Sequence, residues 1–240
     1  MNENTVSDDA EREFSESLLE GDSILGLVVT DRIHELLRAH FRILCRWSKK
    51  LNLTTVHKPR DMAERLYLDS AIIAPCLPGA GSLLDVGTGA GFPGLVLRVW
   101  HPGLHVTLAE ARRRKVSFLK QAVRQMEIDE NLAIRWERVG WRDKHDGAPV
   151  ARGYDEVVSR ATFPPAEWLN CGAELVAPGG RLWLYAGQPH GDGDCGQVGD
   201  ERWLAEHTPR GFSLAEVVRY QLPFAGLERV VVSFRKALDA

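Results

Sequence analysis

A glycine-rich turn between residues 83 and 94 is the part of this chain best suited to binding chemistry. It reads Leu-Leu-Asp-Val-Gly-Thr-Gly-Ala-Gly-Phe-Pro-Gly, so an apolar strand leads into four glycines and the expected start of a helix. Glycines let the backbone approach a ligand closely, and the first N–H groups of a helix have no partner inside the helix. Turns of this kind bind nucleotide-like cofactors at the carboxyl ends of parallel strands.

The spacing of these glycines separates two classes of cofactor. The dinucleotide fingerprint is Gly-x-Gly-x-x-Gly, with a pyrophosphate on the helix that follows. A register that starts at Gly87 puts Phe92 where the third glycine is needed. A register that starts at Gly89 reaches Gly94, but it leaves Asp85 and Gly87 without a role. The pattern acidic-x-Gly-x-Gly-x-Gly instead resembles motif I of class I S-adenosylmethionine methyltransferases, whose ligand has no phosphate and carries an ammonium group that Asp85 can balance. We therefore expect adenosylmethionine, with a dinucleotide as the alternative.

Charged residues stand at the ends of the strands that follow. Glu110 closes an alternating apolar strand, and an acid at this point typically accepts hydrogen bonds from ribose hydroxyls. Arg138 and Arg160 end the third and fourth expected strands, so both should border the same cleft. A basic run directly after Glu110 either binds RNA phosphates or forms a solvated helix face; it consists of Arg112, Arg113, Arg114 and Lys115.

The composition limits the class of protein. The chain has 240 residues, enough for one domain with an extension, and its formal net charge of −3 gives no overall basic signature. A nucleic-acid partner would therefore have to bind a local patch. The four cysteines are widely spaced and no segment resembles an export signal or membrane span, so we expect a cytoplasmic protein with reduced thiols. The eight histidines show no metal-ligand spacing, and we expect no metal.

Three segments follow one another along the chain. Residues 1–22 hold eight acidic residues and one Arg, which predicts a solvated, disordered tail with room for a short helix. Residues 23–78 form a helical region: an apolar stripe predicts a helix over 31–51, and Asp61-Met62-Ala63-Glu64 resembles a capping box that opens a second one. Residues 79–240 alternate strands with helices, which predicts an α/β domain with a parallel sheet.

Five strands and a closing antiparallel pair are expected in the third segment. The strands are expected at 82–87, 104–110, 132–138, 154–159 and 181–186, and the pair at 214–222 and 228–235. Helices are expected near 93–100, 116–126 and 164–176. Pro178-Gly179-Gly180 should stop the last of these helices, and residues 187–211 should form a long loop.

Together these motifs resemble one known family, the glucose-inhibited division protein B (GidB) or RsmG methyltransferases. The resemblance covers roughly residues 31–188 and continues more weakly to Lys236. Its most distinctive part is residues 85–94, where the glycine turn ends in Phe-Pro-Gly. The other matching segments are Asn52-Leu53-Thr54-Thr55, Leu68-Asp69-Ser70, Phe118-Leu119, Ser159-Arg160-Ala161 and Gly187-Gln188.

The resemblance implies a class I S-adenosylmethionine-dependent methyltransferase, with a Rossmann-like seven-stranded sheet behind an N-terminal helical extension. It implies methyl transfer to N7 of a guanosine in bacterial 16S rRNA, free or in the small-subunit particle, by a protein that we expect to be a monomer. The sulfonium methyl is already activated and N7 carries a free lone pair, so we name no catalytic residue. The expected cofactor contacts are Asp85, Gly87, Gly89, Phe92, Glu110, Val139, Gly140 and Arg160, and the expected RNA contacts are Arg112, Arg113, Arg114, Lys115 and Arg138.

Three positions depart from the family pattern. Leu66 replaces a His before Leu-Asp-Ser, Gly140 replaces an acid in the Arg-x-Glu segment, and Ala186 replaces a Lys before Gly187. The lost acid lies on the cofactor side, where backbone contacts can suffice, whereas the other two changes lie near the expected RNA. Two alternatives therefore stay open: a methyltransferase of the same fold with another substrate, and a ribosome-associated module that binds adenosylmethionine without turnover.

Overall fold

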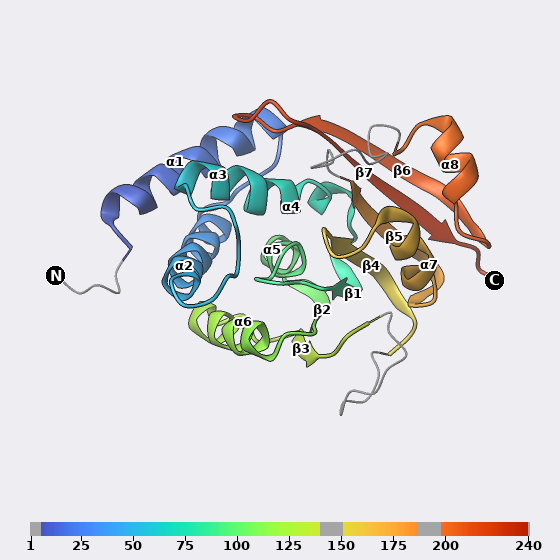
Figure 1. Ribbon diagram of the computed structural model, residues 1–240, viewed down its shortest axis with the longest axis horizontal. Coiled ribbons are helices and arrows are strands. Elements are labelled where there is room, and N and C mark those ends of the chain that lie inside the picture. Colours follow the sequence, from blue (N-terminus) through green and yellow to red (C-terminus); the bar gives the residue numbers. More distant parts are fainter. Residues whose placement is uncertain (1–5, 140–150, 187–197, 240) are drawn as a thin grey trace.

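A seven-stranded sheet runs through the centre of the protein (Figure 1). The computed structural model describes residues 6–139, 151–186 and 198–239. The strand order is β3-β2-β1-β4-β5-β7-β6, and β7 runs antiparallel to both of its neighbours while the first five strands are parallel. The strands are β1 (Ala80–Val86), β2 (Gly103–Glu110), β3 (Leu132–Trp136), β4 (Tyr154–Arg160), β5 (Val176–Ala186), β6 (Phe212–Gln221) and β7 (Glu228–Lys236). The expected parallel sheet and its closing antiparallel pair are confirmed.

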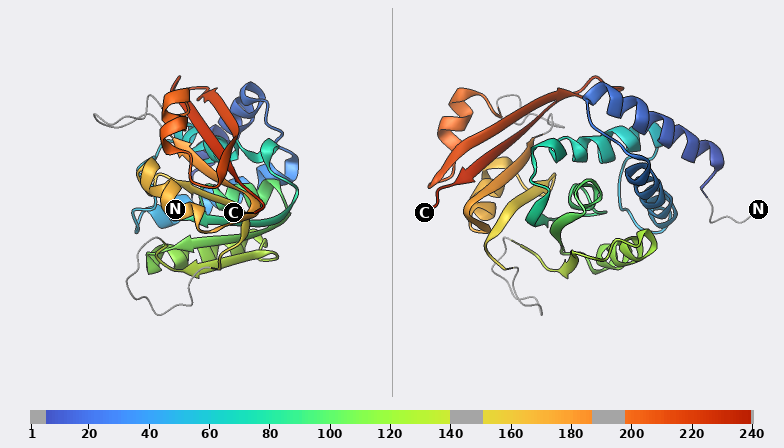
Figure 2. Two further views of the ribbon diagram at one scale, coloured as in Figure 1. Left: turned by 90° about the vertical axis from the view of Figure 1, so that its right-hand side faces the viewer. Right: turned by 180° about the vertical axis from the view of Figure 1, so that it is seen from behind.

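Helices cover both faces of the sheet (Figure 2). They are α1 (Asp8–Leu25), α2 (Asp31–Ser48), α3 (Pro59–Met62), the π-helical turn η1 (Ala63–Leu68), α4 (Asp69–Ala71), the 3-10 turn η2 (Ala74–Cys76), α5 (Gly94–Trp100), α6 (Arg113–Met126), α7 (Pro165–Ala173) and α8 (Glu201–His207). Neighbouring residues of β1 point to opposite faces, so Leu83 packs in the core with α2, α5 and α6, and Leu84 packs in the core with α7 and α8.

The first helix corrects the expectation of a disordered tail at residues 1–22. From Asp8 onward the chain is helical, and Ser7 caps the helix by accepting a hydrogen bond from the N–H of Ala10. The acidic residues of the first turn suit the positive end of the helix dipole. Phe14 and Leu18 lie one turn apart on the buried face, and Phe14 stacks on Phe41 of α2 with ring centroids 4.2 Å apart. Most of the acidic residues of α1 are exposed, so the high charge did not prevent folding.

The helix expected from the capping pattern is α3, and it begins two residues before that pattern. Pro59 starts it after Lys58, and Asp61 lies inside its first turn. Glu64 does not reach back to cap the helix because its carboxylate accepts hydrogen bonds from the N–H groups of Phe224 and Ala225, beyond the end of β6. Glu64 therefore holds the hairpin formed by β6 and β7 against the helical region.

Two expectations in the C-terminal half also need correction. The helix α7 ends at Ala173, and Pro178-Gly179-Gly180 lies inside β5, where the register to β4 shifts between Tyr154 and Glu156. The expected loop at 187–211 contains the helix α8, whose start is capped by Asp200. Trp203 of this helix is buried in the same core as α7. Residues 187–197 lie outside the described part of the chain.

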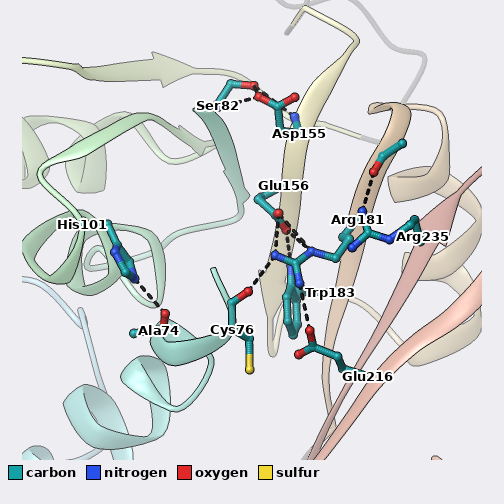
Figure 3. A network of polar contacts seen from close by, with 11 residues as sticks. Ala74, Cys76, Ser82, His101, Asp155, Glu156, Arg181, Trp183, Glu216 and Arg235 are labelled. Atoms are coloured by element: carbon teal, nitrogen blue, oxygen red, sulfur yellow. Dashed lines mark hydrogen bonds and ion pairs between the residues drawn. The ribbon is translucent and has the colours of Figure 1, made fainter. Parts of the chain in front are cut away.

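A buried ion-pair network joins the helical region to the far half of the sheet (Figure 3). Arg181 of β5 bonds the carboxylate of Glu156 on β4 (2.8 Å) and that of Glu216 on β6 (3.0 Å). Its Nη2 also donates to the main-chain carbonyl of Cys76 in η2 (2.9 Å), and Trp183 donates to Glu156 (2.6 Å).

Among the residues that the structure describes, no helix has both the length and the apolar character needed to cross a bilayer.

Candidate functional site

A cavity of about 960 Å³ opens at the carboxyl ends of β1, β2 and β4. In open α/β sheets this is where the strand order reverses and where ligands bind. Its walls come from the glycine turn, the ends of four strands, the helical region and the β6–β7 pair. The residues that line it include Leu66, Asp69, Gly87, Thr88, Gly89, Phe92, Glu110, Ala111, Arg112, Lys115, Arg138, Val139, Arg160, Tyr185, Ala186, Tyr220 and Arg229.

The glycine turn after β1 forms one wall of the cavity. Gly87 has a φ of +74°, and a Cβ there would lie 2.4 Å from the hydroxyl oxygen of Thr162. Gly89 has a φ of +62°, and a Cβ there would meet no heavy atom closer than 3.6 Å, the Nζ of Lys115. Two different demands thus select glycine: close packing of a neighbouring loop at Gly87, and a left-handed backbone facing open space at Gly89.

Asp85 lies behind this turn and is not on the cavity wall. Its side chain is fully buried, and Oδ2 accepts a 2.7 Å hydrogen bond from the N–H of Gly94 at the start of α5. Burial raises the pKa of Asp85 to about 6, although the Thr88 hydroxyl, the Gly94 N–H and Arg160 all lower it. The sequence suggested direct contact with an ammonium group. The structure instead places Asp85 where it fixes the turn.

Glu110 lies on the cavity wall at the end of β2, as expected. It is 5% exposed, and its two oxygens accept hydrogen bonds from the N–H groups of Gly89 (3.0 Å) and Arg112 (2.7 Å). A carboxylate has about four acceptor sites, so these two bonds leave capacity for hydroxyl donors. Its position therefore fits a ligand with a sugar diol.

The third strand supplies the next part of the wall. Arg138 and Val139, which follow β3, line the cavity, as does Ala111, which follows β2. Gly140, the other expected contact in this segment, lies outside the described residues. An apolar side chain such as that of Val139 can pack against a flat heteroaromatic ring, as the apolar walls of ligand pockets do.

The end of the cavity opposite Glu110 centres on Asp69. Arg160 donates a 2.6 Å hydrogen bond to Oδ2 of Asp69, and Tyr220 donates a 2.6 Å bond to Oδ1. The Nε of Arg229 lies 3.7 Å from the same Oδ1. Burial, followed by the negative charge of Asp69, raises the pKa of Tyr220 far above its ordinary value, so the phenol stays a neutral donor.

Sequence reasoning named only Arg160 of this group as a site residue. Asp69 carried a detectable signal, because it is an acid within an otherwise apolar helical stretch of the Leu-Asp-Ser motif. Tyr220 and Arg229 carried none, because the antiparallel register that pairs them across β6 and β7 brings them to the cavity only in the folded chain. Leu66 and Ala186, the two departures expected near RNA, both line the cavity.

The basic run divides between the cavity and the outer surface. Arg112 and Lys115 line the cavity, as Arg138 does, whereas Arg113 and Arg114 are exposed and do not. Within the described residues, no cluster of His, Cys, Asp or Glu could hold a metal ion.

The donor set of the cavity fits a nucleoside-bearing sulfonium compound. A glycine backbone in the left-handed region, a buried carboxylate with spare acceptor capacity and the apolar side chain of Val139 after β3 all line the same cavity. Phosphate recognition would instead need N–H donors at the helix start, and the N–H of Gly94 is already bound to Asp85.

Comparisons with known proteins agree with this geometry. The family model described as GidB, rRNA small subunit methyltransferase G, matches residues 33–193. A protein of Myxococcus xanthus named Ribosomal RNA small subunit methyltransferase G is 33% identical over 226 residues, which cover 93% of this chain and 97% of that one. A protein of the same name from Syntrophus aciditrophicus is 35% identical over 230 residues, covering 95% and 90% of the two chains.

Solved structures support the fold. The 1,6-didemethyltoxoflavin-N1-methyltransferase of Burkholderia thailandensis, solved with S-adenosylhomocysteine, has a TM-score of 0.52 and 18% identity over 88% of this chain and 92% of that one. A SAM-dependent O-methyltransferase of Thermotoga maritima has a TM-score of 0.50 and 17% identity over 81% and 71%. The expected seven-stranded methyltransferase fold is thereby confirmed, and so is the resemblance read from the motifs. The chain belongs to the GidB family of ribosomal RNA small subunit methyltransferases G.

Proposed function

We propose that this protein transfers a methyl group from S-adenosylmethionine to N7 of a guanosine in bacterial 16S rRNA. The family membership over 93% of the chain carries the proposal. The cavity supports it, because a glycine turn and a buried acid form one end and a group of arginines and a tyrosine form the other.

The cofactor would lie along the wall between the glycine turn and β3. Glu110 would accept hydrogen bonds from the ribose hydroxyls, the backbone of Gly87 and Gly89 would allow close approach, and Val139 would flank the adenine. Phe92 lines the cavity with the guanidinium of Arg160 5.5 Å from its ring centroid, and its ring would contact the cofactor. When bound, adenosylmethionine supplies an activated methyl group on a positively charged sulfur.

The protein contributes position and charge. N7 of guanine has an in-plane lone pair and no proton to lose, so no general base is required. Holding two reactants in line can contribute about 7–11 kcal/mol of the barrier. Asp69 fixes Arg160 and Arg229 at the end of the cavity remote from Glu110, where they are placed to hold acceptor atoms of the incoming nucleotide. Arg112, Arg113, Arg114, Lys115 and Arg138 attract the phosphates.

Methylation of unmodified rRNA tests this proposal. We expect radiolabelled adenosylmethionine to label 16S rRNA from a strain that lacks the family's methyltransferase, with the label mapping to guanine N7. The matched control is 16S rRNA from the parent strain, which should accept little label. Small-subunit particles from the deletion strain are tested as a further substrate. The proposal would be contradicted if the protein bound adenosylmethionine but labelled neither the free RNAs nor these particles.

A second candidate is a methyltransferase with the same cofactor and a different substrate. Leu66 and Ala186 favour it, because both line the cavity and replace polar residues of the family pattern. Labelling of another RNA, a protein or a small molecule in whole extract would support it. A module that binds adenosylmethionine without turnover is the third candidate, and any measurable product eliminates it.

The assembly state and location follow from the same proposal. A protein that modifies small-subunit rRNA works in the cytoplasm, where that RNA is assembled, and a monomer leaves the arginine-lined surface open to a large partner. Sedimentation of the purified protein at micromolar concentration should give the mass of one chain, 26.8 kDa. A dimer would contradict this part.

A further inference from the structure

We propose that Trp136 and Arg113 form a stacking platform for an unpaired base of the RNA substrate, beside the cofactor cavity and outside it. This inference rests on the proposed function, because it takes RNA as the substrate class.

The indole of Trp136 is held in one orientation at the edge of the sheet. Trp136 is the last residue of β3, which is an edge strand and lies beside α6 (Figure 1). Its Nε1 donates a 3.0 Å hydrogen bond to the main-chain carbonyl of Ala111. The guanidinium carbon of Arg113 lies 5.4 Å from the ring centroid. The hydrogen bond at one edge of the ring and the cation near it thus restrain the indole, which is only partly packed against other side chains.

Trp136 remains 48% exposed despite these contacts. Among the described residues, the large apolar side chains that are this exposed are aliphatic apart from Trp136. A single exposed apolar side chain is ordinary, but an indole that a hydrogen bond and a neighbouring cation hold beside a basic run presents a flat face suited to a ligand. Flat π-faces are what single-stranded nucleic acids stack on.

The charge around Trp136 matches an RNA strand. Arg112, Arg113 and Arg114 are exposed, and within the described residues none of them forms an ion pair with a carboxylate. Helix stability does not explain the run, since cations in the first turn of α6 oppose the helix dipole. A polyanionic backbone would relieve that repulsion while a base rests on the indole.

The platform is continuous with the cavity. Ala111, whose carbonyl accepts the hydrogen bond of the indole, lines the cavity, and so do Arg112 and Arg138. Trp136 itself does not line the cavity. A strand whose target guanosine enters the cavity therefore passes the platform with a neighbouring nucleotide. Base-specific RNA recognition commonly splays out adjacent bases in this way.

Replacement of Trp136 tests the platform through RNA binding, without any need for turnover. The variants are Trp136→Ala, Trp136→Phe and Arg113→Ala. The matched controls, Leu214→Ala and Arg210→Ala, remove an exposed apolar side chain on the opposite edge strand, β6, and an exposed cation next to it. Filter binding to in vitro transcribed 16S rRNA gives the RNA affinity, and calorimetry with adenosylmethionine gives the cofactor affinity of each variant.

We expect Trp136→Ala to weaken RNA binding by about 5- to 150-fold, the range found when one stacked base is lost. Trp136→Phe should stay within about fivefold of the parent, and both controls within about twofold. The salt dependence should separate stacking from charge: Arg113→Ala reduces the slope of log K against log salt by about 0.7, while Trp136→Ala leaves the slope unchanged.

Two results would overturn the platform. One is RNA affinity of Trp136→Ala within twofold of the parent. The other is a loss of adenosylmethionine affinity equal to the loss of RNA affinity, which would assign the indole to the adenine or to the shape of the cavity. Failure of the proposed function is a separate result, because a parent protein that binds 16S rRNA through Trp136 without methylating it retains the platform and loses the reaction.

Discussion

Arg160 at the end of β4 donates a 2.6 Å hydrogen bond to Asp69, the first residue of α4 in the helical region. The second oxygen of Asp69 accepts from Tyr220 of β6, and Arg229 of β7 lies nearby. One carboxylate with little solvent exposure therefore joins three parts of the chain at the end of the cavity opposite Glu110. The helical extension is part of the site, and its contribution is to orient two arginines that the sheet carries.

Replacing Asp69 should impair methyl transfer more than cofactor binding. Asp69→Asn keeps the side-chain shape and one acceptor oxygen, but it leaves Arg160 and Arg229 without their shared counter-charge. We expect kcat/KM for 16S rRNA to fall by about 10- to 100-fold, since a hydrogen bond to a charged partner is worth about 1.5–3 kcal/mol. The adenosylmethionine dissociation constant, measured by calorimetry, should change by less than about threefold.

The control for Asp69 is Asp155→Asn. Asp155 also accepts hydrogen bonds through its carboxylate, from the N–H and hydroxyl of Ser82, but at the opposite end of β4. Its rRNA kinetics should match the parent. An Asp69→Asn protein with parental kcat/KM for 16S rRNA would show that the carboxylate does not position the arginines for substrate.

Replacing Glu110 should act on the cofactor instead. Glu110→Gln turns one acceptor into a donor that faces an N–H group, either that of Gly89 or that of Arg112. We expect the affinity for adenosylmethionine to fall by about 10- to 100-fold, by the same magnitude for charge-assisted bonds. Because the proposed partner is the ribose, the affinity for 5′-methylthioadenosine should fall by a similar factor, although that compound lacks the amino-acid part.

The control for Glu110 is Glu174→Gln, which alters an exposed ion pair with Arg152, and neither of these residues lines the cavity. It should bind both ligands as the parent does. If Glu110→Gln weakened adenosylmethionine but not methylthioadenosine, the carboxylate would interact with the amino-acid end and the ribose assignment would be wrong.

The sequence predicted the sheet well because local patterns determine it. Alternating apolar residues and glycine turns placed β1, β2 and β4 within a few residues, and Gly87, Glu110 and Arg160 were assigned to one cavity because parallel strands end at the same edge. The glycine spacing was specific enough to suggest the ligand class, since it encodes backbone geometry directly.

Contacts between distant segments were not predictable in the same way. Asp85 looked like a ligand contact, but the hydrogen bond from Gly94 turns it into a support for the turn. Glu64 matched a capping pattern, yet the hairpin after β6 takes its carboxylate. Tyr220 and Arg229 reach Asp69 through a hairpin more than 140 residues away in sequence, and no local pattern encodes such a pairing.

Breaking the Arg181 network should destabilise the whole fold (Figure 3). Arg181→Ala leaves the carboxylate of Glu156 buried without its partner, and burial already raises the pKa of Glu156 against the lowering effect of Arg181 and Trp183. We expect a loss of about 3–5 kcal/mol in the free energy of unfolding, measured by urea denaturation. The exposed pair Arg152–Glu174 provides the control, because Arg152→Ala should cost at most about 1 kcal/mol. Equal losses in the two variants would show that the network contributes no more than a surface pair.

His40 should make the fold acid-sensitive, because it joins α2 to the underside of the site. Its ring is fully buried, with Nδ1 2.8 Å from the hydroxyl of Tyr67 and the ring centroid 5.5 Å from that of Phe92 in the glycine turn. Burial lowers the pKa of His40 to about 4, from the ordinary value of 6.5. Between about pH 4 and pH 6.5, His40 therefore carries a proton in the unfolded chain but not in the folded chain.

This difference gives the sign of the pH effect. The stabilisation from neutral His40 is fully present above about pH 6.5 and is lost as the pH falls toward 4, by about 3 kcal/mol in total at 1.36 kcal/mol per pKa unit. Asp85 opposes it, since a raised carboxyl pKa makes stability fall as the pH rises from about 4 to 6. His40→Gln should therefore remove the loss that His40 causes in acid. The unfolding free energy should then fall as the pH rises from 4 to 6, because the raised carboxyl pKa values of Asp85 and Glu156 act in that direction. Urea denaturation at half-unit pH steps measures both slopes, with His57→Gln on the surface as the control. A parental acid limb in His40→Gln would mean that other groups drive the acid response.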